Sequence, residues 1–264
     1  MAAIINTIKS LFRRKQNVPL VCSISLDEDG HPIAEDPSHK HTAACFIDFE
    51  PLAVVELFQS QGCQACPPAV PDIQEAAKHP NLLLLTYNVT IFDHLGWKDT
   101  FAKSAWDQRQ RAYVKKWQRT SLFTPQVVVN GAADGSGAGG KGAVEDIVRQ
   151  ARGFHSAMDW HIYLDANDTE IRIDTDRAEV EAHDILVVLY HDGEETVKIG
   201  KGPNKGKKLK HRNVVKDIIK IGEWHGGDLT LQLPVPKSSM QAHENAVVLV
   251  QAGSGGPIVA AVNI

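Results

Sequence analysis

The sequence has few cysteines, no long apolar run and no excess of positive charge. Its 264 residues include four cysteines, too few for a fold held together mainly by disulfides. No apolar run approaches the roughly 20 residues of a membrane-spanning helix, so we expect no transmembrane segment. A net charge of −4 argues against a nucleic-acid partner. With 43% apolar and 23% charged residues, the composition is that of a soluble globular protein long enough for two cores.

Two of the four cysteines form a C-x-x-C pair. Cys63 and Cys66 follow the apolar run Val54–Phe58 and precede a helical pattern, so they lie where a strand ends and a helix begins. Free N–H groups and the positive dipole at a helix N-terminus favour a thiolate, the attacking species in disulfide exchange. Half of a zinc site is the alternative. Cys22 and Cys45 form no second C-x-x-C, which favours redox chemistry over zinc.

Two prolines extend this pattern. Pro71 follows Cys66 by five positions, and Thr124-Pro125 precedes an apolar run that predicts a strand over Val127–Asn130. In both respects the chain resembles the thioredoxin superfamily, which has a kinking proline in the active-site helix and a cis-proline facing the C-x-x-C. Proline tolerates a cis peptide bond at little cost, although proline also begins ordinary strands. We expect Pro71 to bend its helix rather than end it, because an apolar face continues beyond it.

Seven motifs, in order, make a closer resemblance. They are V-E-L-F-x-S-Q-G-C-x-x-C-P-P at 55–68, D-x-L-G-W-K-D-x-F-A at 93–102, Q-R-Q-R-A-Y at 108–113, T-P-Q-V-V-V-N-G at 124–131, G-x-G-x-N-x-G-x-x-L at 200–209, N-V-V at 213–215 and I-G-E-W at 221–224. From about Leu52 onward the chain is similar to the family called domain of unknown function 1223 (DUF1223). That resemblance implies a thioredoxin-like domain joined to a β-rich domain, and it implies little about substrate.

The periodicity predicts the same order of domains. We expect strands over 53–58, 82–89 and 127–130 and helices over 64–79, 100–119 and 141–153. From residue 159 onward, short alternating runs separated by glycine-rich turns are typical of an antiparallel sandwich. The predicted fold class is therefore an α/β thioredoxin-like domain followed by an all-β, sandwich-like domain. The predicted boundaries are a partly irregular N-terminal leader at 1–50, the first domain at 51–156 and the second at 157–264.

The first 17 residues are basic and partly apolar. Lys9, Arg13, Arg14 and Lys15 come largely after the isoleucines, whereas a secretory signal places its basic residues first. We therefore predict a cytoplasmic protein, with a mitochondrial presequence as the alternative. A membrane-surface helix or a docked terminal helix also fits this composition.

Four residues are predicted to carry the chemistry. Cys63 precedes the helix and is assigned as the nucleophile, and Cys66 as the resolving thiol. Glu56 is a lone acid in a buried strand, where burial raises a carboxyl pKa and suits it to relay a proton to or from Cys66. An acid satisfied at the strand edge is the alternative. Pro125 is expected to shape the substrate groove.

Four further residues are predicted to bind substrate. Thr124 would pair its backbone with an incoming peptide, as in strand addition. Gln64 and Ala65 lie between the thiols. Trp97 belongs to the segment 90–119, which is longer than a minimal thioredoxin needs and is expected to cap or shape the thiol site.

Three other patterns in the sequence are of types that can bind ligands. The segment Lys198–Arg212 has six lysines and one arginine without an acid, so it could bind an anionic partner or form a solvated hairpin. The glycine-rich run 135–142 resembles a P-loop, but Gly142 stands where a serine or threonine should bind magnesium, which favours a turn. Nothing in the spacing of His79, His94 and the cysteines requires copper or zinc, and we expect no metal and no cofactor.

The sequence thus predicts a thiol–disulfide oxidoreductase acting on protein or small-molecule thiols and disulfides. A binding module whose C-x-x-C holds a soft metal or senses redox state is the main alternative. In a third interpretation, the pair forms a purely structural disulfide.

Overall fold

The structure is a computed structural model, and it describes residues 50–264 of the chain. The predictions for the leader, its targeting role, Cys22 and Cys45 lie outside the described residues. Within the described part, no helix is both long and apolar enough to cross a membrane.

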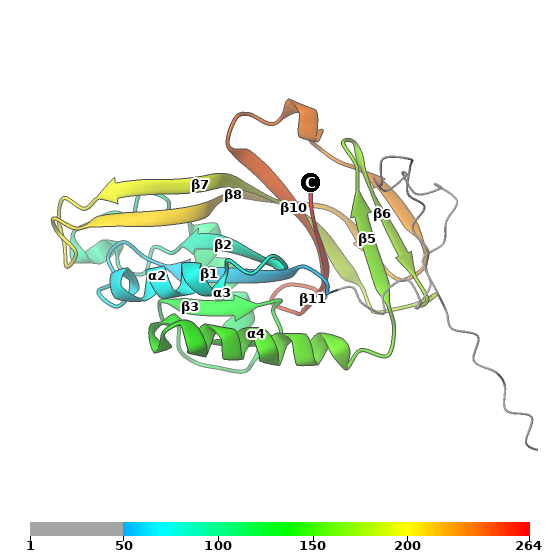
Figure 1. The fold of residues 1–264 in the computed structure, drawn as a ribbon, viewed down its shortest axis with the longest axis horizontal. Coiled ribbons are helices and arrows are strands. Elements are labelled where there is room, and N and C mark those ends of the chain that lie inside the picture. The colour runs from blue at the N-terminus through cyan, green and yellow to red at the C-terminus, as the bar shows by residue number, and fades with distance from the viewer. Residues whose placement is uncertain (1–49) are drawn as a thin grey trace, which may run out of the picture. The chain divides into compact units, whose positions relative to one another are not determined.

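The fold is mixed α/β and is dominated by one large mixed sheet (Figure 1). Its strand order is β11-β10-β7-β8-β2-β1-β3-β4. The strands are β1 (Ala53–Gln59), β2 (Leu82–Asn88), β3 (Gln126–Val129), β4 (Ala133–Ser136), β7 (His183–Lys198), β8 (Lys208–Trp224), β10 (Glu244–Gln251) and β11 (Ile258–Asn263). The pairs β1–β2 and β2–β8 are parallel, and the other pairs are antiparallel. A second sheet has the order β5-β6-β9, formed by β5 (Ile162–Ala166), β6 (Glu170–Thr175) and β9 (Leu229–Gln232).

Three α-helices accompany these strands in the described residues: α2 (Cys66–Ala76), α3 (Ser104–Lys116) and α4 (Lys141–Ser156). Three short 3-10 helices, η2 (Asp93–Leu95), η3 (Gly137–Gly139) and η4 (Lys237–Ser239), lie in the connections. The helices predicted from periodicity are therefore present, with ends shifted by a few residues. Helix α2 continues through Pro71, as expected, because the apolar residue Ile73 beyond it is fully buried.

Strand β1 is buried on both faces. Val55 and Leu57 pack with α2 and α4 in one core. The alternate residues Val54 and Phe58 pack in another core, which includes Trp106 and Tyr113 of α3. Because successive side chains of a strand point to opposite faces, α2 and α3 cover opposite faces of the sheet. A third core joins β7, β8 and β10 to the smaller sheet.

Strand pairing crosses the predicted boundary at residue 156. Strand β8 joins β2 through the pair Thr86–Val214, so the strands of both halves form one sheet. Two side chains reinforce this junction. The Thr86 hydroxyl donates to the Arg212 carbonyl at 2.6 Å, and the Asn213 amide donates to the Leu84 carbonyl at 2.9 Å. The long β7–β8 hairpin is thereby fixed against the strands that lead to the C-x-x-C, and the predicted division into two domains stays a prediction.

Candidate functional site

The two thiols lie at the junction of β1 and α2. Cys66 is the first residue of α2, and Pro67 and Pro68 occupy its first turn, where no intrahelical N–H bond is lost. The Cys63 N–H donates to the Ser60 carbonyl at 3.1 Å, which closes the turn before the helix. Both cysteines are free thiols. Their exposed fractions are 4% and 2%, so exposure does not distinguish nucleophile from resolving thiol.

Hydrogen bonding does distinguish them. A hydrogen bond from the Cys66 thiol lowers the pKa of Cys63 to about 6, helped by Thr124 and by the N–H groups of Ala65 and Cys66, and opposed by burial. The same hydrogen bond, burial and the charge on Cys63 raise the pKa of Cys66. At neutral pH the negative charge is therefore on Cys63, which lies just before the N-terminus of α2.

The Thr124–Pro125 peptide bond is cis, as predicted, and leads into β3 beside β1. The Cys63 Sγ lies 3.4 Å from the Thr124 carbonyl oxygen. The Thr124 hydroxyl is buried and has no other hydrogen-bond partner in the described structure, so it is free to donate to the thiolate. The structure thus brings Cys63, Cys66, Thr124 and Pro125 together, while the intervening Gln64 and Ala65 are exposed.

A buried asparagine from the β7–β8 connection holds the loop at residues 60–65 between β1 and α2, which we call the thiol loop. The Asn204 amide donates to the carbonyls of Gln61 and Cys63 at 2.8 and 2.7 Å, and its oxygen accepts from Lys207 at 2.9 Å. Asn204 is fully buried. Sequence reasoning placed this residue in a motif but gave it no role. The available signal was a lone asparagine among closely spaced glycines.

Trp97 packs against the same β7–β8 connection and binds the thiol loop. Its indole N–H donates to the Gln61 side-chain oxygen at 2.8 Å. Its ring packs against Gly200, where an added Cβ would lie 3.0 Å from the ring. Gly202, with φ of +73°, is similarly close to the Trp97 Cβ. Trp97 therefore joins the hairpin connection to the thiol loop, and its predicted contact with substrate stays a prediction.

Polar side chains beneath the thiol loop form a buried network. The two ring nitrogens of His211 lie 2.9 Å from the Gln59 amide and 3.3 Å from the Gln61 amide. Burial lowers the pKa of His211 to about 4, so the imidazole is neutral at physiological pH. Asp99 accepts the Gln61 N–H at 2.7 Å and the Asn88 amide at 2.9 Å, and burial raises its pKa. This network fixes the backbone from which Cys63 projects.

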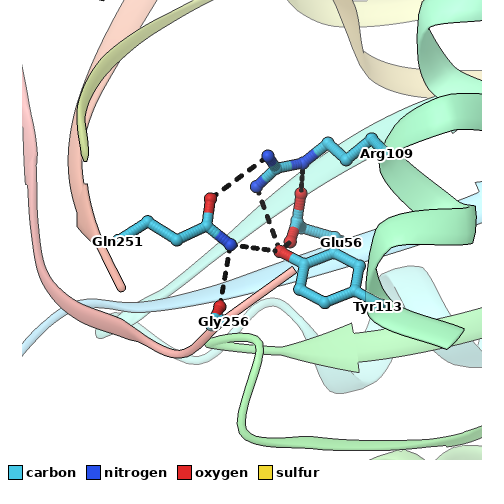
Figure 2. Close-up of polar contacts among 5 residues, drawn as sticks. All are labelled: Glu56, Arg109, Tyr113, Gln251 and Gly256. Atoms are coloured by element: carbon cyan, nitrogen blue, oxygen red, sulfur yellow. Dashed lines mark hydrogen bonds and ion pairs between the residues drawn. The ribbon is translucent and has the colours of Figure 1, made fainter. Parts of the chain in front are cut away.

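Glu56 belongs to a separate buried polar group with Arg109, Tyr113, Gln251 and the Gly256 carbonyl (Figure 2). Its side chain is on the face of β1 shared with Val54 and Phe58, opposite to α2, and is fully buried. Arg109 binds one carboxylate oxygen at 2.6 Å, and the Tyr113 hydroxyl donates to the other. Gln251 completes the group through Arg109, Tyr113 and the Gly256 carbonyl. The structure therefore does not bring Glu56 to Cys66 for a direct proton relay. It shows an acid satisfied in a central strand rather than at an edge.

The described residues hold no group of three or more His, Cys, Asp or Glu side chains that could bind a metal ion. His79 is exposed in the turn after α2, and His94 is exposed in η2. Within the glycine-rich run 135–142, Gly137 is buried, and a Cβ there would lie 2.4 Å from Ile73, whereas Gly142 is exposed.

Comparisons with known proteins place the chain in a family. No curated protein matches it. The crystal structure of protein AGR_C_4864 from Agrobacterium tumefaciens is similar, with 29% identity and a TM-score of 0.62 over 82% of this chain and 95% of that one. HBP35 of Porphyromonas gingivalis shares the fold, with 12% identity and a TM-score of 0.53 over 82% of this chain and 75% of that one. The model of the family described as protein of unknown function (DUF1223) matches residues 54–251, and the chain belongs to that family.

Proposed function

We propose that the protein is a thiol–disulfide oxidoreductase built on a thioredoxin-like domain. The order β1-α2-β2-α3-β3-β4-α4, with the strand order β2-β1-β3-β4, supports that architecture. The observation that carries the proposal is the asymmetric dithiol. Cys63 has a stabilised thiolate at a helix start, its partner Cys66 keeps its proton, and the cis Thr124–Pro125 bond lies beside them.

The proposed exchange runs in two steps. The Cys63 thiolate attacks one sulfur of a substrate disulfide, which forms a mixed disulfide and releases one substrate thiolate. Cys66 then attacks the Cys63 sulfur and releases the second substrate thiol, and its proton passes to a leaving thiolate. The protein ends as a Cys63–Cys66 disulfide, and the substrate gains two electrons, one proton from Cys66 and a second proton from solvent. The reverse sequence oxidises a substrate dithiol.

The raised pKa of Cys66 gives the two thiols their order of reaction. While Cys63 is charged, its hydrogen bond with Cys66 keeps the second thiol protonated. Formation of the mixed disulfide removes that charge, so the pKa of Cys66 falls at the stage at which it must attack. This coupling requires no carboxylate relay, which agrees with the position of Glu56 on the opposite face of the sheet.

A redox titration tests the proposal. Metal-free protein is equilibrated in glutathione buffers, the thiols are trapped by alkylation, and the peptide containing both cysteines is read by mass. A two-electron transition between about −120 and −270 mV is expected for a catalytic dithiol. A pair that stays reduced throughout that range, or is oxidised only beyond it, would refute the proposal. Zinc binding at micromolar or tighter affinity would instead favour the binding module.

Two variants test the assigned roles. Cys66→Ser should accumulate a mixed disulfide with a peptide disulfide substrate, because nothing remains to resolve it. Cys63→Ser should form none and serves as the matched control. Equal trapping by both variants would contradict the assignment of Cys63 as nucleophile.

A further inference from the structure

A pocket of about 850 Å³ lies between α2 and the start of β8. Cys66, Val70 and Pro71 line it on the helix side, and His211 and Arg212 line it on the hairpin side. The β7–β8 hairpin extends beside α2 (Figure 1). Residues 207–212 of the basic segment Lys198–Arg212 therefore line the same pocket as Cys66. A volume of this size is typical of sites for small molecules.

The pocket wall is predominantly positive. Its cations outnumber its carboxylates, as shown by the lining residues Lys78, Lys207, Lys208, Lys210 and Arg212 against Glu75 and Glu194. Lys78 is paired with Glu75 at 2.5 Å and Lys210 with Glu194 at 2.9 Å. Lys207 binds Asn204. In the described structure, Lys208 and Arg212 have no carboxylate partner within ion-pair distance, which leaves two cations available to a ligand.

The floor of the pocket is uncharged, whereas its wall carries the charged residues. Pro67, Val70 and Pro71 of α2 are apolar, and His211 is uncharged because burial lowers its pKa. Cys66 lies at this floor, whereas Cys63 contacts Thr124 and is not among the lining residues. The dithiol therefore borders the basic pocket through Cys66.

We propose that this pocket binds a low-molecular-weight thiol that carries carboxylates, or its disulfide, as the redox partner of the dithiol. The proposal rests on the oxidoreductase function above and names a substrate class for it. The carboxylates would bind Lys208 and Arg212, the ligand's apolar part would lie on Val70 and Pro71, and its sulfur would face Cys66. Arginine suits this role because its planar fork binds a carboxylate through two parallel hydrogen bonds.

Reduction of the Cys63–Cys66 disulfide by this ligand consumes two ligand thiols. The first thiolate attacks the Cys63–Cys66 disulfide, forms a mixed disulfide with one cysteine and releases the other. The second attacks the ligand sulfur of that mixed disulfide and releases the remaining cysteine. The ligand leaves as its own disulfide. At neutral pH the protein gains two electrons and one proton, which is held by Cys66, and the other proton of the two ligand thiols passes to solvent. Release of Cys63 in the first step is favoured by the hydrogen bonds that Thr124 and the N–H groups of Ala65 and Cys66 make to its thiolate, because a stabilised thiolate is the better leaving group.

Binding is tested separately from exchange. S-methylglutathione retains both carboxylates but cannot form a disulfide, so its titration by calorimetry into the full chain measures the pocket alone. The double variant Lys208→Gln with Arg212→Gln should weaken binding by roughly 4- to 25-fold, at 2- to 5-fold for each exposed charge. Lys205→Gln is the matched control, since Lys205 is an exposed cation of the same hairpin connection outside the pocket.

Three results would overturn the pocket assignment. They are no binding of S-methylglutathione, equal binding by the double variant, and binding of inorganic phosphate or of the diethyl ester as tight as that of the charged ligand. Added salt should weaken the interaction.

Exchange is then measured as the rate at which glutathione reduces the oxidised protein. Glutathione should react faster than its diethyl ester, and the double variant should reduce that preference. Equal rates for both thiols, unchanged in the variant, would refute the pocket while leaving the oxidoreductase function intact. Binding of S-methylglutathione without any redox transition of the dithiol would refute both the proposed function and the assignment of the ligand as a redox partner.

Discussion

The reactivity of Cys63 should rise with pH around a midpoint near 6, well below the ordinary thiol value of 9.0. At pH 7 a thiol with a pKa of about 6 is about 90% ionised, whereas an unperturbed thiol is about 1% ionised. Because only the thiolate reacts, alkylation by iodoacetamide reports this fraction. The rate is followed from pH 4.5 to 9.5 by mass spectrometry of the peptide containing Cys63, which separates it from Cys22 and Cys45.

The perturbation that tests the cause is removal of the Cys66 thiol. A hydrogen bond to a charged group contributes about 1.5–3 kcal/mol, which corresponds to about one to two pKa units. Cys66→Ala should therefore move the Cys63 midpoint to about 7–8. Cys66→Ser keeps a hydroxyl donor and should stay closer to the wild type. A wild-type midpoint above 8, or the same midpoint in all three proteins, would refute the reasoning.

The same pKa shift predicts how the redox potential varies with pH. The pKa of Cys63 is depressed, so the reduced form gains stability above pH 6 and loses that gain as the pH falls through 6. At pH 7 the gain is about 1.4 kcal/mol, or about 30 mV toward a more oxidising potential. Below pH 6 two protons accompany two electrons, and the potential should change by about 59 mV per pH unit. Above pH 6 one proton accompanies two electrons, and the slope should fall to about 30 mV per pH unit. A single slope across pH 6 would contradict the assignment of a thiolate to Cys63.

Three further predictions concern the buried polar groups around the site. Glu56→Gln should lower the free energy of unfolding in urea by about 3–5 kcal/mol, because it leaves the Arg109 charge buried without its partner. The double variant Glu56→Gln with Arg109→Met should recover part of this loss. Full stability of the single variant would contradict a stabilising ion pair between Glu56 and Arg109. Asn204→Ala should cost about 1–3 kcal/mol because two buried carbonyls lose their donor, whereas Lys205→Ala should leave the urea midpoint unchanged. His211 has a pKa of about 4 when folded against an ordinary 6.5, so the unfolded state binds more protons between these values and stability should rise with pH there, by about 3 kcal/mol in total. His211→Gln should flatten the curve of unfolding free energy against pH in that window, and an identical curve would show that His211 is not buried as a neutral ring.

The local features of the thiol site could be predicted from sequence because they depend on short spacings. A β-branched run before C-x-x-C predicts the strand-to-helix junction, and the prolines at 67 and 68 predict the first turn of α2. The cis peptide bond at Thr124–Pro125 was instead predicted from the resemblance to the thioredoxin superfamily, in which a cis-proline faces the C-x-x-C. These inferences needed no knowledge of how distant strands pair.

Glu56 shows where such reasoning ends. The sequence identified a lone acid in a buried strand, but a central strand is apolar on both faces, so alternation could not tell which face the carboxylate occupies. A usable signal lay elsewhere. Arg109 and Tyr113 are four residues apart on one helix face, a spacing that allows both to reach one buried anion. Joining the two signals requires knowing that α3 packs on the β1 face opposite to α2.

The position of the β7–β8 hairpin beside the thiols could not be predicted from the sequence, because it depends on one pair of strands that are far apart in the chain. The parallel pair Thr86–Val214 fixes β8 against β2, and this places Asn204 and His211 beneath a loop about 140 residues earlier in the chain. Local propensity carries no information about such a pair, and composition described the hairpin only as basic. The asparagine Asn204 nevertheless holds the carbonyl of Cys63, and the lysines and arginine of the hairpin line the same pocket as Cys66. The hairpin is therefore a structural part of the thiol site, and a fragment that ended at residue 156 would expose the buried carbonyls of Gln61 and Cys63 and leave α2 without the opposite wall of its pocket.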